Sequence, residues 1–193
     1  MKLSSLLLLP ALALAAPTID SRQAPQIQIS SFIITGSGCP GGSTSAEISP
    51  DGTSITFGLD SYQVAPGSTQ SCSITLGLNF PSGCTSAVIA STYHGFVQIN
   101  SGDSGLFSST YSVSPGSTSG NPPSTSFTSS QWGNGGVYTK SDSVTARATI
   151  SNSNGQVVNL AIGTQIRLTG NPADTSLLSV DDASISITQV SRC

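Results

Sequence analysis

The sequence predicts an all-β fold: an antiparallel β-sandwich, with jelly-roll-like or immunoglobulin-like layering, that is stabilised by two disulfides. Three observations predict it. Apolar and polar residues alternate through several segments, which is typical of strands with one buried face and one solvent face. Turn-forming residues separate these segments at the spacing of a sandwich. Beyond the N-terminal segment, no window keeps apolar residues at helical spacing.

The alternation identifies the individual strands. A first strand is expected at residues 26–35. Apolar residues then occupy every second position through SITLGLNF (73–80), through VTARATI (144–150) and from Val158 to Leu168. The apolar residues Leu178 and Val180 stand at even positions, whereas the apolar residues Ile185 and Ile187 stand at odd positions, so the apolar face changes between them. We therefore expect a bulge or a tight turn at residues 181–182.

Turn residues lie between these segments. In Ser49-Pro50-Asp51-Gly52, proline fixes φ and glycine accepts a positive φ, which predicts a hairpin turn. Further breaks are expected at 65–69, 80–83, 151–155 and 170–175. The longest irregular segment, residues 114–126, is rich in Ser, Gly and Pro and is expected to be a surface loop.

The N-terminus predicts export. Residues 1–16 combine a basic start, a short apolar run and small residues before Pro17, the pattern of a secretory signal peptide. Residues 17–25 form a short polar leader or pro-piece, and residues 26–193 have the length of a single β-sandwich domain. We expect a secreted, extracellular protein that is not inserted in a membrane.

The four cysteines favour disulfides over a metal site. An even number of cysteines after a signal peptide is typical of an oxidising compartment. Their spacing lacks the Cys-x2-Cys pairs of zinc sites, and the chain has one histidine. Cys72 and Cys84 flank a strand of about 26 Å, too long for one bridge. We expect the pairs Cys39–Cys72 and Cys84–Cys193.

Low charge excludes several classes of partner. Lys and Arg total 6 and are scattered singly, so the chain has no basic patch for nucleic acid or anionic lipid. The pI near 4.7 favours solubility but indicates no partner. No motif indicates a cofactor or a metal, and we expect a monomer.

Several segments resemble the domain of unknown function 4360 family, small secreted proteins of filamentous fungi and some bacteria. The segments are, in chain order, GSGCPGGS, ISPDGTSITFGLDSYQVAPG, SCSITLGLNFPSG, YHGFVQINSG, LAIGTQIRL and the terminal cysteine. The resemblance covers about residues 26–193 and implies an all-β secreted domain without an established activity. The chain lacks the family's Pro-Cys-Gly turn before LAIGTQIRL and has Cys84 where the family usually has another residue. This difference implies that one bridge is rearranged.

Candidate functional residues are few. His94 is the one histidine, and the alternating pattern places it on the exposed face of a strand. The sequence contains no Gly-x-Ser-x-Gly motif that would supply a nucleophile for it. Glu47 and Asp60 lie on neighbouring predicted strands and form the one carboxylate pair that would suit glycoside hydrolysis. Trp132 and Tyr138 lie beside the 114–126 loop. They would either pack in the core, which we favour for Trp132, or stack on a sugar ring.

These features favour a non-enzymatic extracellular protein, a binding module of the cell wall or one directed at a host. Its partner would be a polysaccharide or a host or cell-wall protein. The alternatives are a secreted carbohydrate-active hydrolase that uses Glu47 and Asp60, and a purely structural wall protein. The candidate ligand-facing residues are Trp132, Tyr138, Glu47 and Asp60.

Overall fold

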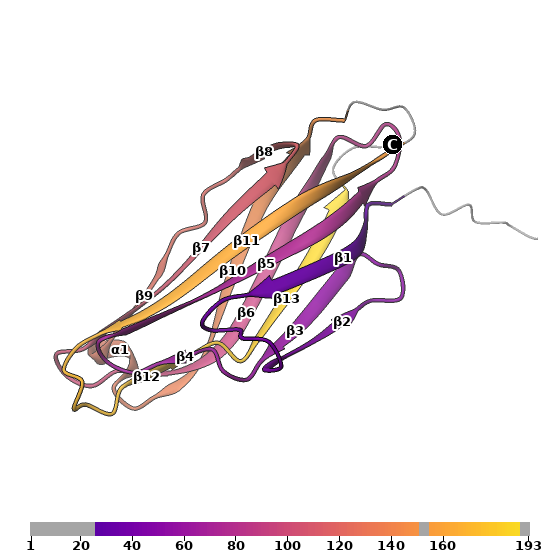
Figure 1. Cartoon of the computed structure of the whole chain (residues 1–193). Helices are drawn as coiled ribbons and strands as arrows, with labels where there is room; N and C mark the ends of the chain where they lie inside the picture. Colours follow the sequence, from indigo (N-terminus) through magenta and orange to yellow (C-terminus); the bar gives the residue numbers. More distant parts are fainter. Residues whose placement is uncertain (1–25, 151–154, 190–193) are drawn as a thin grey trace, which may run out of the picture.

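The computed structural model describes residues 26–150 and 155–189, which form two antiparallel sheets stacked face to face (Figure 1). The antiparallel all-β prediction is confirmed. The described residues contain one disulfide, Cys39–Cys72, rather than the predicted two. The other predicted pair, Cys84–Cys193, ends at a residue outside the described ranges, and no described cysteine is free. The predicted signal peptide (1–16) and leader (17–25) also lie outside the described residues.

Each sheet draws its strands from the whole length of the chain. Sheet A has the spatial order β1 (Gln28–Thr35), β5 (Ser68–Phe80), β11 (Gln156–Thr169), β7 (Ser104–Ser114) and β9 (Thr125–Thr128). Sheet B has the order β2 (Thr44–Ile48), β3 (Ser54–Leu59), β13 (Asp182–Gln189), β6 (Ser86–Gln98), β10 (Gly136–Ala148) and β8 (Gly116–Ser119). Two short strands, β4 (Gln63–Val64) and β12 (Leu177–Ser179), extend sheet B, and α1 (Ser129–Trp132) links β9 to β10.

From β5 to β11 the chain passes from one sheet to the other at every connection. Consecutive strands therefore lie in different layers, and each strand pairs with partners distant in sequence. The resulting molecule is elongated, with α1, β9 and β12 near one end (Figure 1). The hydrophobic core lies between the layers and joins residues from both sheets in one cluster.

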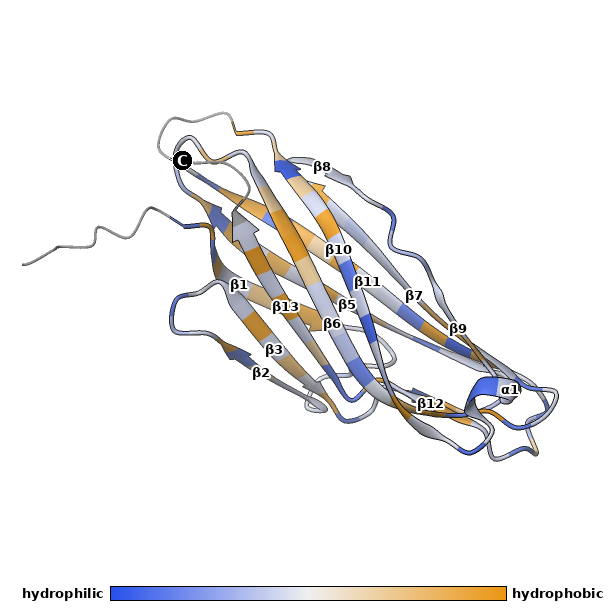
Figure 2. Cartoon of the chain, turned by 180° about the vertical axis from the view of Figure 1, so that it is seen from behind, coloured by the Kyte–Doolittle hydropathy of each residue, from blue (hydrophilic) through white to orange (hydrophobic). Residues whose placement is uncertain are grey.

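The alternating sequence pattern explains the two layers. On β5, Ile74, Leu76 and Phe80 are buried, and on β11 the residues from Val158 to Leu168 alternate as predicted. Figure 2 shows the same alternation of hydrophobic and hydrophilic residues along the strands of sheet B. Burying one face of the long central strands removes apolar surface from water, which stabilises the stack.

The predicted disulfide between Cys39 and Cys72 forms within a crowded loop. Its Cα atoms are 5.5 Å apart, and both side chains are buried. A Cβ at Gly38 would lie 2.1 Å from the ring of Tyr62, and Gly36 has a φ of +147°. The glycine-rich segment around Cys39 therefore lets the loop pass beneath Tyr62, whose hydroxyl donates to Thr164 Oγ1 at 3.1 Å.

The predicted turns that lie within the described residues are confirmed, whereas the predicted turn at 151–155 lies almost wholly outside them and one predicted loop differs. Gly52 has a φ of +70°, and its N–H donates to the Ser49 carbonyl, as the predicted hairpin requires. The parity change near residue 181 corresponds to the break between β12 and β13. The 114–126 segment, however, is not wholly irregular. It contains β8 and the start of β9, because each finds a free sheet edge, on β10 and on β7 respectively.

Candidate functional site

An aromatic pocket lies where the chain passes from the edge of sheet A to sheet B. β9 forms the edge of sheet A, the single turn of α1 follows it, and a glycine-rich turn leads into β10. Gly135 has a φ of +70°, and a Cβ on Gly136 would lie 3.3 Å from the Trp132 ring. The glycines therefore allow both the tight turn and the close approach of the indole to the backbone.

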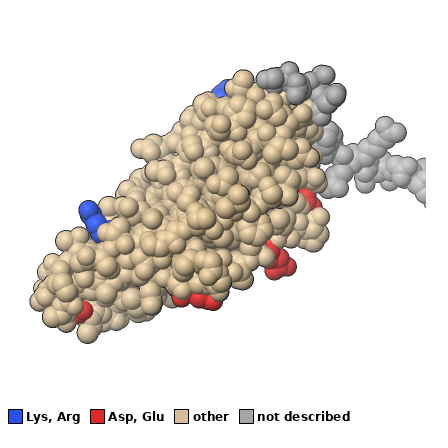
Figure 3. Space-filling view, viewed as in Figure 1, with Lys and Arg blue, Asp and Glu red and all other residues tan. Residues whose placement is uncertain are grey.

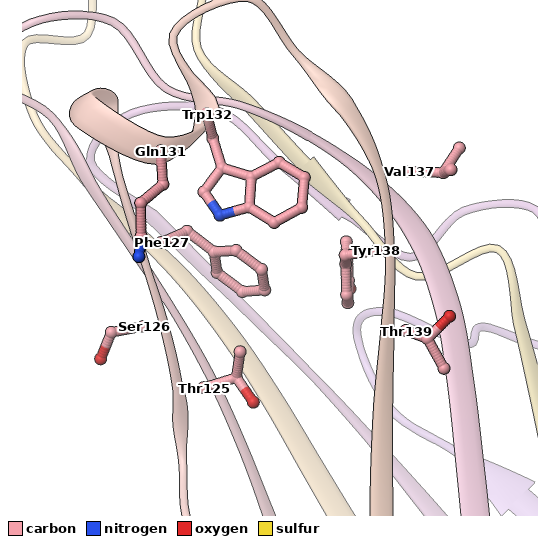
Figure 4. A pocket seen from close by; sticks show the side chains of 8 residues that line it. All are labelled: Thr125, Ser126, Phe127, Gln131, Trp132, Val137, Tyr138 and Thr139. Atoms are coloured by element: carbon pink, nitrogen blue, oxygen red, sulfur yellow. The ribbon is translucent and has the colours of Figure 1, made fainter.

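Three aromatic rings form the apolar part of the pocket (Figure 4). Phe127 lies at the centre, with its ring centroid 6.0 Å from Trp132 and 4.8 Å from Tyr138, both in edge-to-face geometry. Phe127 and Tyr138 are buried, whereas Trp132 is half-buried. The indole is therefore the ring that a ligand would reach first.

The rest of the lining is polar and uncharged. The cavity has a volume of about 460 Å³. Thr125, Ser126, Gln131 and Thr139 supply hydroxyl and amide groups around the rings, and Val137 lies at the rim with 81% of its surface exposed. Because none of these lining residues carries a charge, the arrangement suits a neutral ring with an apolar face and polar edges.

Tyr138 is held in place from the opposite side. Its hydroxyl donates to the Ser179 carbonyl at 2.6 Å, and its ring contacts both Phe127 and Phe107. Burial raises the pKa of Tyr138 well above its usual value, and the nearby charge of Asp181 adds to the increase. The phenol therefore stays neutral and contributes its ring, not its hydroxyl, to the pocket.

The structure brings two of the four candidate ligand-facing residues together. Trp132 and Tyr138 line the same pocket, and the favoured interpretation of Trp132 as a core residue holds only for the buried part of its ring. Glu47 and Asp60 lie elsewhere, because three strands separate β2 from β10 in sheet B. Glu47 lies opposite Thr56 in the neighbouring strand, and Asp60 follows Thr56 by four residues. The backbone positions of Glu47 and Asp60 are therefore about 13 Å apart along the strand direction.

Comparison with known proteins identifies the chain by its sequence. The sequence profile described as domain of unknown function (DUF4360) matches residues 25–193. The chain belongs to the DUF4360 family. Its sequence is also 29% identical over 166 residues to an uncharacterized secreted protein of Arthroderma benhamiae. That match covers 80% of this chain and 65% of the relative, so this DUF4360 chain spans less than two thirds of the relative's length.

Two carbohydrate-binding modules are among the solved structures to which the DUF4360 chain is similar. One is TmCBM61 in complex with β-1,4-galactotriose, with a TM-score of 0.28, 11% identity, and coverage of 84% of this chain and 90% of the module. The other is the xylan-binding module CBM15, with a TM-score of 0.27, 13% identity, and coverage of 83% and 100%. Both TM-scores are low, so the ligand must be argued from the pocket itself.

A buried polar cluster lies between the two sheets of the DUF4360 domain. The side chains of Lys140 and Asp142 are 2% and 1% exposed and form an ion pair. Asp142 also accepts hydrogen bonds from Ser109 and, at 2.9 Å, from Tyr111, while Lys140 Nζ donates to Ser109 Oγ at 3.0 Å. Tyr93 completes the cluster with a 3.0 Å hydrogen bond to Tyr111.

The cluster was not among the predicted sites, although the alternation of residues along β10 indicates that its two charged residues face inward. Lys140 and Asp142 share the parity of Tyr138 and Val144, which places them on the inward face of the strand. Because charged residues usually lie on the surface, Lys140 and Asp142 would not be predicted to be buried from their residue types. The interior tolerates the pair because each charge has a partner and additional hydrogen-bonding groups.

The single histidine pairs with an aspartate on the neighbouring strand β13. His94 is exposed on β6, as predicted, and its Nδ1 lies 2.8 Å from Asp182 Oδ1. Within residues 26–150 and 155–189, no group of three or more His, Cys, Asp or Glu side chains is placed to hold a metal. The helix found in these ranges is too short to span a membrane.

Proposed function

We propose that this DUF4360 protein is a secreted, non-enzymatic binding protein that holds a saccharide ring in the aromatic pocket. Residues 26–193 would act as one β-sandwich domain after removal of the N-terminal segment. The secreted relative supports export. The polysaccharide is the partner we favour over a host or cell-wall protein, because the pocket is concave and the size of a small ligand.

The half-buried indole of Trp132 is the observation that carries the proposal. A sugar ring has an apolar face of C–H groups and an edge of hydroxyls. The indole, backed by Phe127, offers a flat apolar surface, and the amide of Gln131 offers hydrogen bonds beside it, with the hydroxyl of Thr139 farther along the pocket (Figure 4). A purely structural wall protein has no use for such a surface.

A hydrolase receives less support from the geometry. Glycoside hydrolysis requires two carboxyl groups within about 10 Å of each other across the scissile bond. The backbone positions of Glu47 and Asp60 lie about 13 Å apart along the strand direction, and both residues lie far from the pocket. Among the described residues no carboxylate lines the pocket, so a bound sugar would meet neither a general acid nor a nucleophile from them.

The test uses tryptophan fluorescence, because Trp132 is the one tryptophan of the chain. Neutral oligosaccharides from β-glucan, chitin, xylan and galactan should be titrated into the wild type. A bound sugar should shift or quench the emission. Calorimetry should then show that Trp132→Ala weakens the same ligand about tenfold or more, a loss of about 1.4 kcal/mol or more.

Phe32→Ala supplies the matched control. Phe32 is another partly exposed aromatic side chain, 39% exposed, and it packs against Phe57 between β1 and β3, away from the pocket. It should leave affinity unchanged. Equal binding by wild type and Trp132→Ala, or no binding across a broad glycan array, would refute the proposal.

A further inference from the structure

A second hollow adjoins the aromatic pocket on the other side of β9. It has a volume of about 200 Å³ and shares Ser126 and Phe127 with the pocket. Its other lining residues come from β7, β9 and β11: Ser104, Gly105, Leu106, Thr128, Arg167 and Thr169. The two hollows therefore meet at one edge strand.

Strand pairing places the basic residue of this hollow in line with β9. Ser126 lies opposite Leu106, and Leu106 lies opposite Arg167, so the three form one row across sheet A. Two strand spacings, about 10 Å, separate Ser126 from Arg167. A ligand of several linked rings could therefore reach both hollows.

Arg167 is the one charged residue among those that line the second hollow. It is exposed, and among the described residues no carboxylate forms an ion pair with it. Figure 3 shows this face of the molecule as largely uncharged, with basic atoms at two separate places and acidic atoms along its lower and right-hand edges. Across the sheet Arg167 pairs with Thr69 on one side and with Leu106 on the other, so neither described strand neighbour offers the guanidinium an anion.

Asp103, at the same end of the sheet, does not neutralise this arginine. It lies opposite Gly170, three residues beyond Arg167, or about 10 Å along the strand. Asp103 is buried, and its two oxygens accept hydrogen bonds from Ser176 Oγ and the Asn171 N–H. Within the described part of the chain, the hollow therefore combines an unneutralised guanidinium with neutral hydroxyls.

We infer that the second hollow is a subsite for a sugar residue that carries a carboxylate. The inference rests on the proposed function and narrows it to acidic oligosaccharides. One ring of the ligand stacks on Trp132, the chain crosses β9 at Ser126, and a neighbouring residue presents its carboxylate to Arg167. The planar guanidinium can donate two parallel hydrogen bonds to a carboxylate, and because both partners are charged these bonds are stronger than those it would donate to the hydroxyls of a neutral sugar.

The test compares two forms of one ligand. Oligogalacturonate and its methyl ester have the same backbone, but esterification removes the negative charge. By calorimetry at low salt, the wild type should bind the acid about tenfold more tightly than the ester. Added salt should reduce this preference because it screens an exposed ion pair. A glucuronate-substituted xylo-oligosaccharide and its ester serve as a second pair that distinguishes the source of the carboxylate.

Two arginine variants make the comparison specific. Arg167→Gln should bind acid and ester with equal affinity, at the level of the wild type with the ester. Arg147→Gln removes the other described exposed arginine, on β10 opposite Ser117 of β8, and should behave as the wild type. Thermal unfolding of each variant confirms that the fold is retained.

The outcomes separate this inference from the proposed function. Any of three results overturns the carboxylate subsite: the wild type binds acid and ester with equal affinity, it binds neither acidic oligomer, or its preference for the acid persists in Arg167→Gln. Saccharide binding that depends on Trp132 would still stand in each of those cases. Saccharide binding that ignores Trp132 overturns the proposed function instead.

Discussion

Removing one member of the buried Lys140–Asp142 pair should cost a large part of the stability of this protein. Lys140→Met leaves a carboxylate that is 1% exposed with two hydroxyl donors, from Ser109 and Tyr111, in place of three donors. Breaking a buried ion pair in this way costs about 3–5 kcal/mol. Asp142→Leu should cost at least as much, because it leaves a buried ammonium and also removes the acceptor of both hydroxyls.

The double variant separates the charge from the packing. Lys140→Met with Asp142→Leu removes both charges and leaves only hydroxyl groups unsatisfied. Its loss should be smaller than the sum of the two single losses by about 3 kcal/mol or more, since neither charge is then buried alone. Arg147→Met is the matched control, because it removes an exposed cation from the same strand. It should change stability by about 0.5 kcal/mol or less.

Guanidinium chloride unfolding, followed by circular dichroism and by the fluorescence of Trp132, measures these free energies. For a chain of this length each 1 kcal/mol corresponds to about 2–4 °C in Tm, so the single variants should also melt well below the wild type. Single variants that lose less than about 1 kcal/mol would refute the reasoning. So would a double variant whose loss equals the sum of the singles.

Two further predictions concern the disulfide and the tyrosines. Replacing Cys39 and Cys72 together by alanine should lower stability by about 3–4 kcal/mol, the chain entropy of a 33-residue loop, and an unchanged denaturation midpoint would contradict this. Burial raises the pKa of Tyr111 to about 12 and raises the pKa values of Tyr62, Tyr93 and Tyr138 well above 10. Neutral tyrosines therefore favour the fold below pH 10, and this contribution is lost as pH rises from about 10 through 12. Near-ultraviolet absorbance should show tyrosinate forming only as the protein unfolds, and ionisation near pH 10 with native circular dichroism would exclude this account.

The strands were predictable because burial alternates along them. Along most of β5 and β11 apolar residues occupy every second position, and these positions are buried in the sheet. The Cys39–Cys72 pair was predicted because the strand between Cys72 and Cys84 is too long for those two cysteines to be bridged, and the structure confirms it. The second disulfide, the signal peptide and the leader stay predictions, because each depends on residues outside the described ranges.

The candidate site was only partly predictable, because it depends on which strand edges meet. β9 has four residues in a segment rich in Ser, Thr, Gly and Pro, too short to show a period. Trp132 and Tyr138 are near in sequence, so their proximity could be expected. The approach of Arg167 to the same edge strand follows from the order β11-β7-β9, which the sequence does not reveal.

The buried polar cluster explains how the aromatic pocket keeps its shape. The side chain of Lys140 on β10 donates a hydrogen bond to Ser109 on β7, which links the two sheets across the core. β7 in turn pairs with β9, where Phe127 lies opposite Gly105, and a Cβ on that glycine would lie 3.2 Å from the Cβ of Phe127. Tyr138 precedes Lys140 on β10 by two residues and therefore faces the same interior. The cross-sheet bond thus helps to hold β7, and with it the strand that carries Phe127, against the strand that carries Tyr138. A charged group inside the core therefore supports an uncharged site at the surface.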